Sequence, residues 1–175
     1  MISQELTNRL LALSSPGVQQ ELLERHPMLL SDDLVAAVKR EADQLLGIDP
    51  MRSLHAGELL EQIAALSSNP AHEALALLAQ ANASNIGLAR YEHSIALYDR
   101  AAEIYRSQNQ EVEAATAQIG KLYALANLGR YDEAIAAGEW AGHVLREHGQ
   151  WLRLAKLTSN LAITHGRRGE DTVAL

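Results

Sequence analysis

Histidines are the residues of this sequence best suited to bind a metal or to transfer a proton. One of the seven lies among carboxylates at metal-ligand spacing. Glu139, His143 and Glu147 recur every four residues, which places them on one face of a helix, and His148 follows directly. A metal site needs ligands from a second segment, and no other predicted helix supplies a matching His or carboxylate. The simpler interpretation is an exposed acidic helix face with a histidine near the helix C-terminus, where positive charge is favourable. We therefore expect no metal and no cofactor.

Groupings that would support catalysis are also missing from the sequence. There is no cysteine, which excludes a thiol nucleophile, a thiolate zinc site and a disulfide together. His72 and Glu73, like Glu92 and His93, are adjacent, so on a helix they point to different faces and make poor acid–base pairs. Gly-rich phosphate loops, Ser/His/Asp arrangements and HExxH motifs are absent. We expect a protein that is not an enzyme.

The composition predicts an all-α protein that does not bind nucleic acid. Hydrophobic residues make up 47% of the 175 residues, but aromatics only 4% and Phe is absent, so Leu, Ile and Ala must fill the core. A net charge of −7 opposes binding to a phosphate backbone. No apolar run approaches the roughly 20 residues of a membrane span, and the N-terminus lacks the order of a signal peptide. We expect no membrane partner and a cytoplasmic location.

An eight-residue stretch that recurs about every 40 residues organises the rest of the chain. Residues 128–135 read LGRYDEAI, residues 88–95 read LARYEHSI, and residues 168–175 read RGEDTVAL. Ala89, Gly129 and Gly169 share one phase of this repeat, followed at fixed distances by a small and then an aliphatic residue. A period of about 40 residues is typical of stacked helical hairpins. Glycine at this phase allows the left-handed backbone conformation that ends a helix.

Helix boundaries follow from capping residues and prolines. Ser15-Pro16, Asp49-Pro50 and Asn69-Pro70 place an N-cap before a proline at the first helical position, and Ser31 caps another helix that Gly47 ends. Short breaks between helices require neighbours to pack antiparallel. We predict an N-terminal helical cap over residues 1–48 and about three hairpins over residues 49–175. The expected helices span about 4–14, 16–25, 31–47, 50–66, 70–87, 90–106, 111–127, 131–148 and 150–167.

The residues of this repeat resemble the tetratricopeptide repeat in its longer form of about 40 residues. Residues 128–135 carry the resemblance, together with Leu161 and Ala162 followed by Gly169, while Lys121 and Ser94 depart from the pattern. The resemblance implies an α-solenoid of antiparallel helical hairpins. The leading helices are also similar to segments that precede such repeats in large bacterial proteins, many of which end in a caspase-like domain of the CHAT type.

The resemblance further implies a partner-binding surface, because the first helix of each hairpin lines the concave face of such solenoids. The implied function is a scaffold or regulatory repeat region that binds a protein or peptide, in a longer chain with a C-terminal effector. An alternative is the ligand-sensing domain of a bacterial regulator, which binds a small peptide or other small ligand. The residues at the corresponding phase are Gln80, Ala83, Gly120, Tyr123, Asn127, Lys156, Ser159, Asn160, Ile163 and Arg167.

The last repeat is expected to be incomplete. Residues 172–175 would open another helix, so we expect the chain to be a fragment of a longer protein. An uncovered apolar stripe of Leu154, Leu157 and Leu161 would then promote self-association, giving a homo-oligomer through the open C-terminal repeat.

Overall fold

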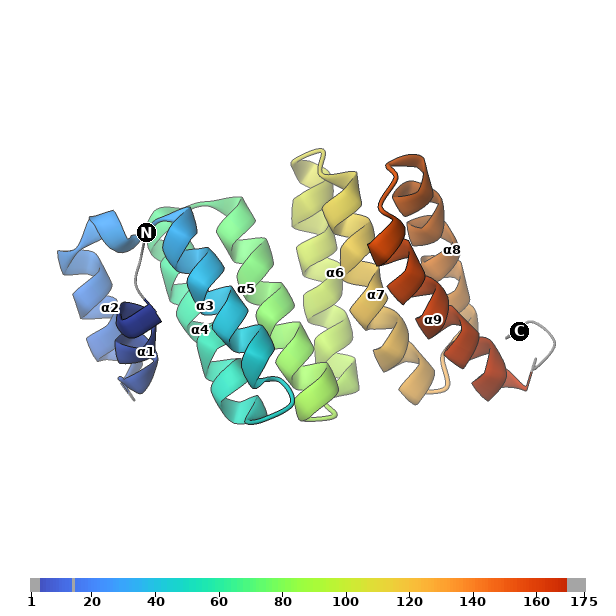
Figure 1. The fold of residues 1–175 in the computed structure, drawn as a ribbon, viewed down its shortest axis with the longest axis horizontal. Coiled ribbons are helices and arrows are strands. Elements are labelled where there is room, and N and C mark those ends of the chain that lie inside the picture. Colours follow the sequence, from blue (N-terminus) through green and yellow to red (C-terminus); the bar gives the residue numbers. More distant parts are fainter. Residues whose placement is uncertain (1–3, 14, 170–175) are drawn as a thin grey trace. The chain divides into compact units, whose positions relative to one another are not determined.

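The computed structural model describes residues 4–13 and 15–169, and every regular element in these ranges is a helix. The chain divides into two compact units, Met1–Ala89 and Arg90–Leu175, and in each of them successive helices pack against one another (Figure 1). The prediction of an all-α fold of consecutively packed helices is confirmed. None of the described helices has both the length and the apolar character that crossing a bilayer requires.

The first unit begins with short helices and continues with longer ones. The first helix ends at Ala12, before the predicted end at residue 14, which lies outside the described residues. The predicted boundary after residue 48 falls inside this unit, between two helices that pack against each other. The elements are α1 (Gln4–Ala12), α2 (Pro16–Arg25), the 3₁₀ segment η1 (Pro27–Leu29), α3 (Asp32–Leu45), α4 (Pro50–Ser67), α5 (Pro70–Asn82) and the π-helical segment η2 (Ala83–Gly87).

Side-chain caps start three of these helices, as predicted. Ser31, Asp49 and Asn69 accept hydrogen bonds from the backbone N–H groups of Leu34, Arg52 and Ala71. Ser15 occupies the N-cap position of α2, but its side chain accepts no capping hydrogen bond, so its predicted role as a cap is wrong. Pro16 alone marks the start of that helix, because its fixed φ suits the first helical position.

The core of the first unit is aliphatic and extends through α1 to α5. Its largest fully buried side chains are leucines and one isoleucine, and a fully buried polar residue, Gln19, lies beside them. The Gln19 Nε2 group donates to the Leu10 carbonyl at 3.1 Å and contacts the His55 ring, and Gln19 Oε1 accepts from the Gln62 amide at 3.4 Å. Its polar atoms therefore have partners in the interior. The main side chains are Leu10, Leu23, Leu34, Val38, Leu59, Leu60 and Ile63.

A π-helical turn follows the end of α5. The backbone N–H of Leu88 donates to the carbonyl of Ala83, five residues earlier, where an α-helix would bond four residues apart. The predicted continuous helix to residue 87 missed this wider turn. Ala83 is fully buried, so the expectation that it lies on a partner-binding surface is wrong.

The second unit consists of four helices of nearly equal length in its described part. They are α6 (Tyr91–Ser107), α7 (Glu111–Asn127), α8 (Tyr131–Glu147) and α9 (Trp151–Arg168). Each packs against the next, and α7 also packs against α9. The predicted ranges for α6 to α9 agree with the structure to within one residue at each end.

One backbone geometry ends α6, α7 and α8. Asn109, Gly129 and Gly149 have φ values of +58°, +72° and +65°, which is the left-handed region. The next N–H, of Gln110, Arg130 or Gln150, donates to the carbonyl five residues earlier (2.8–3.0 Å), as in the Schellman motif. Ala89 and Gly169 also have positive φ, so the left-handed conformation predicted for the repeat phase of Gly129 is confirmed.

Glycines let the helices of the second unit approach closely. A Cβ at Gly120 of α7 would overlap the fully buried ring of Tyr98 from α6, and a Cβ at Gly138 of α8 would meet Leu161 of α9. Leu157 is fully buried and its neighbour Leu161 is partly buried against α8. Leu154 is also partly buried, so the stripe of leucines packs against α8 on one side, and its expected role in self-association stays a prediction. Residues 170–175, including the expected last helix start, lie outside the described part.

Candidate partner-binding face

The predicted binding residues of the second unit lie on two helices that run side by side. Helices α7 and α9 both flank α8 and pack against each other, so they run in the same direction (Figure 1). Spacings of three and four residues place the chosen side chains of each helix on one surface. We call this surface the α7/α9 face, and its residues are Tyr123, Asn127, Lys156, Ser159, Asn160, Ile163 and Arg167.

Tyr123 is the centre of the α7/α9 face. Its side chain is 38% exposed, and its ring meets the ring of Tyr91 edge to face, with centroids 6.4 Å apart. The guanidinium carbon of Arg167 lies 6.0 Å from the centroid of the same ring, at the outer limit of a cation–π contact. Ile163, on the same face, is 48% exposed. The face therefore combines the aromatic ring of Tyr123, the exposed aliphatic side chain of Ile163 and the cation of Arg167.

The two asparagines of the face are engaged by the protein itself. Asn127 Nδ2 donates to the Tyr123 carbonyl at 2.7 Å, within its own helix. Asn160 Nδ2 donates to the carbonyl of Ile119 at 2.8 Å and so joins α9 to α7. Only the amide of Asn160 therefore links the two helices. We had expected both to bind a peptide backbone, and that role stays a prediction.

The charge of α9 differs from that of the whole chain. The helix contains Arg153, Lys156, Arg167 and Arg168 and no acidic residue, whereas the complete chain carries a net charge of −7. Arg153 pairs with Glu113 at 3.6 Å and Arg168 pairs with Asp132 at 3.1 Å. Lys156 and Arg167 are exposed on the α7/α9 face. The face is thus a basic surface on an acidic protein.

Gln80 and Ala83, the remaining predicted site residues, belong to the first unit. The Gln80 amide donates to the Gly57 carbonyl at 3.3 Å and to the Glu61 carboxylate at 2.9 Å. Gln80 therefore crosslinks α5 to α4, while Ala83 is buried. Gln80 is only partly buried, so its predicted role in partner binding stays a prediction.

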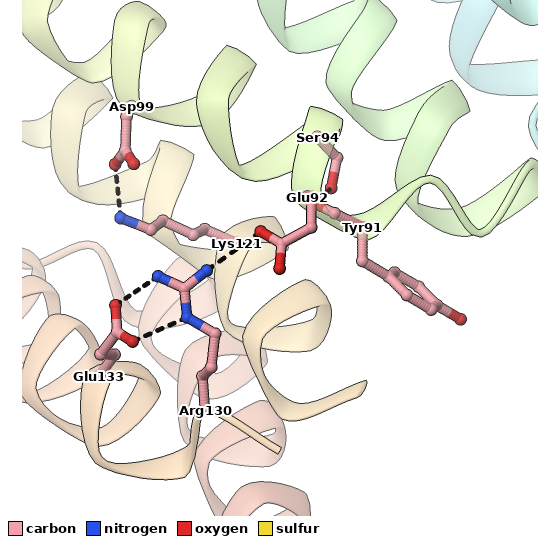
Figure 2. A network of polar contacts seen from close by, with 7 residues as sticks. All are labelled: Tyr91, Glu92, Ser94, Asp99, Lys121, Arg130 and Glu133. Carbon is pink, nitrogen blue, oxygen red and sulfur yellow. Dashed lines mark hydrogen bonds and ion pairs between the residues drawn. The ribbon is translucent and has the colours of Figure 1, made fainter. Parts of the chain in front are cut away.

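The second unit also contains a network of ion pairs that sequence reasoning missed (Figure 2). Arg130 forms a two-point ion pair with Glu133, at 2.6 and 2.7 Å, and reaches Glu92 of α6 at 3.2 Å. The hydrogen bond between the two side chains raises the pKa of Arg130 and lowers the pKa of Glu133. Lys121 of α7 donates to Asp99 of α6, which explains a lysine where the repeat pattern has an apolar residue.

The ion pairs of this network connect helices to one another. Each charged group in Figure 2 faces an opposite charge, and Ser94 donates its hydroxyl to the carbonyl of Tyr91 at 2.7 Å. A catalytic group needs a free proton or lone pair directed at a substrate. The arrangement joins α6 to α7 and α8. Its sequence signal was the pairing of opposite charges one repeat apart, at Glu92 and Arg130.

In the described part of the chain, the histidines do not gather with other potential ligands into a metal site. His143 lies 3.3 Å from Glu147 on the exposed side of α8, and within residues 4–13 and 15–169 no three potential ligands gather around a point. His72 is buried in the first unit, where its ring contacts the Ser67 hydroxyl at 2.9 Å and the Asp32 carboxylate at 2.8 Å. That ring links the starts of α3 and α5.

Comparison with known proteins adds no relative to this description. No protein-family model, no curated protein and no solved structure matches the chain.

Proposed function

We propose that the second unit is a non-catalytic protein-interaction module that binds an acidic peptide segment with apolar side chains along the α7/α9 face. The observation that carries the proposal is the exposed pair of Tyr123 and Ile163, accompanied by Lys156 and Arg167 on a chain that is otherwise acidic. Apolar side chains of a peptide would pack on Tyr123 and Ile163 while its carboxylates meet the two cations.

The resemblance of the repeat to tetratricopeptide repeats supports the same function. In such repeats, the first helix of each hairpin contacts the partner, and α7 and α9 occupy that position here. The regular helix ends at Asn109, Gly129 and Gly149 support the assignment of repeats. A regulatory module that senses a small peptide would use the same face and the same contacts.

Charge reversal on the α7/α9 face tests the proposal. The probe is a fluorescein-labelled 12-residue peptide of alternating Glu and Leu, with a second peptide of alternating Lys and Leu as comparison. We expect saturable anisotropy with the acidic peptide, weakening as salt rises, and at least tenfold weaker binding to the double variant Lys156→Glu/Arg167→Glu.

Arg146→Glu, on the exposed side of α8, is the matched control and should bind the acidic peptide like the wild type. Equal binding of both peptides, or unchanged binding to the double variant, would show that the α7/α9 face does not recognise acidic segments.

A further inference from the structure

A cavity of about 570 Å³ opens in the first unit between α1, α2 and η1. Leu6 and Leu10 of α1, Leu22 of α2, and Met28 and Leu29 of η1 form most of its wall. Leu10 is fully buried, whereas Met28 is 92% exposed at the mouth. The cavity is therefore apolar at depth and open to solvent at one side.

Every polar side chain that lines this cavity in the described part of the chain belongs to an arginine or a histidine. Arg9, Arg25 and His26 contribute to the wall, and neither a carboxylate nor an uncharged polar side chain does. The chain as a whole has 22 acidic and 15 basic residues, so an all-basic lining runs against its composition. An apolar cavity with cationic groups at its wall is complementary to a molecule with a hydrocarbon part and an anionic end.

Arg25 can turn from its present partner to such an anion. It pairs with Glu21 at 2.6 Å, one helical turn earlier on α2, and both side chains are mostly exposed. Exposed ion pairs of this kind contribute little, because water competes with them. A carboxylate that is held beside Arg25 by its own buried chain would compete with Glu21 for the guanidinium.

We propose that this cavity binds a single-chain fatty acid, with the hydrocarbon chain against the leucines and the carboxylate near Arg9 and Arg25. Its volume falls within the roughly 300–1,000 Å³ of small-molecule sites. The wall comes from a few turns of short helix, which suits one flexible chain better than the long groove that a helical peptide requires. This site lies in the first unit and does not depend on the function proposed for the second.

Isothermal titration calorimetry on the complete chain tests the site, with octanoate, decanoate and dodecanoate below their micelle concentrations. We expect one saturable site and an affinity that rises about fourfold for each added methylene, the factor that corresponds to burying one such group. Decyltrimethylammonium, with a similar chain and the opposite charge, should bind at least tenfold more weakly than decanoate. Absence of saturable binding, or an affinity independent of chain length, overturns the proposal.

Exposed substitutions separate the ligand site from the stability of the fold. Arg9→Glu/Arg25→Glu and Met28→Glu change side chains at the surface of the cavity and should each weaken decanoate binding at least fivefold, while Arg146→Glu leaves it unchanged. Circular dichroism should show unaltered helicity in all three. Unchanged decanoate binding in the double variant overturns the proposed role of the arginines. An acidic amphipathic peptide that binds the wild type and not the double variant, without any decanoate binding, overturns the fatty-acid class.

Discussion

The two units of this chain define their helices in different ways. In the first unit, α3, α4 and α5 begin at the side-chain caps Ser31, Asp49 and Asn69, and a proline follows the last two. In the second unit, no described helix has a side-chain cap, and left-handed residues end helices of 17 or 18 residues. Individual capping side chains thus set the helix starts of the first unit. In the second unit, the same left-handed backbone conformation ends each described helix.

The units also differ in what fills them. All five tyrosines and both tryptophans lie at positions 91–151, within the second unit, whereas the hydrophobic core cluster of the first unit contains only aliphatic side chains. Tryptophan fluorescence therefore reports on the second unit alone, while circular dichroism reports on both. This difference allows substitutions in either unit to be followed separately.

The largest expected effect is that of Gly120→Val in the second unit. The new side chain would overlap Tyr98, which is fully buried, and overpacking of this kind costs about 2–3 kcal/mol. Urea unfolding followed by tryptophan fluorescence should show this loss. Gly47→Val in the first unit, where a Cβ has open space, should leave that transition unchanged. A loss below about 1 kcal/mol for Gly120→Val would mean that Tyr98 can move aside.

Alkaline pH should destabilise the second unit through Tyr105. Burial, followed by the nearby charge of Glu113, raises the pKa of Tyr105 to about 12, while Arg153 acts in the opposite direction. Because the folded pKa exceeds the usual 10, this stabilisation is complete below pH 10 and is lost as pH rises through 12. The loss should reach up to about 2 kcal/mol.

Comparison of wild type with Tyr105→Phe isolates this contribution. Their fluorescence-detected unfolding free energies should converge or cross as pH increases from 9 to 11.5, since only the wild type carries the Tyr105 phenol. Tyr123→Phe, which removes a half-exposed phenol, serves as the control. A constant difference between wild type and Tyr105→Phe across this range would contradict the raised pKa.

The helix-ending rule of the second unit predicts a conformational cost at Gly129. A Cβ at this position meets no atom within 4 Å, so Gly129→Val acts only through its φ of +72° and should cost about 1–2 kcal/mol. Gly129→Asn should cost much less, because Asn109 already adopts the same conformation one helix earlier. Equal losses for the two substitutions, measured by urea unfolding, would argue against the left-handed assignment.

The smallest expected effect on stability comes from substitutions at the helix starts of the two units. Asn69→Ala removes the acceptor for the Ala71 N–H and should cost about 1 kcal/mol. Gln110 occupies the matching position before α7, where no side-chain cap exists. Gln110→Ala should therefore change the free energy of unfolding by only a few tenths of a kcal/mol. Amide hydrogen exchange in the first turns of α5 and α7 would measure both. Similar losses at both positions would abolish the distinction between the units.

Much of the second unit could be predicted because its helix ends depend on residues that are close together in the sequence. A positive φ at Gly129 and Gly169 follows from glycine at a repeated phase, and the helix ranges follow from the spacing between these positions. Asn109 was missed as a helix-ending residue because asparagine is a weaker signal than glycine for the left-handed region.

Features that depend on contacts between helices were harder to predict. Ala83 was placed on a surface from the repeat phase, but it is fully buried, and its burial depends on packing that the repeat phase does not show. The close approach of α9 to α8 was not visible in the sequence either, because it depends on Gly138 lying against Leu161. On the α7/α9 face, the residue types were visible in the sequence, but the hydrogen bond from Asn160 to Ile119 required coordinates.

The left-handed residues at 109, 129, 149 and 169 lie 20 positions apart, and this interval constrains how the second unit can change length. Adding one 20-residue segment between α7 and α9 would reverse the direction of every later helix and move the amide of Asn160 away from the Ile119 carbonyl. Adding 40 residues, such as a second copy of residues 90–129, would preserve direction and phase together. The unit can therefore gain or lose length as whole hairpins, and an added hairpin would lengthen the surface to which α7 and α9 belong.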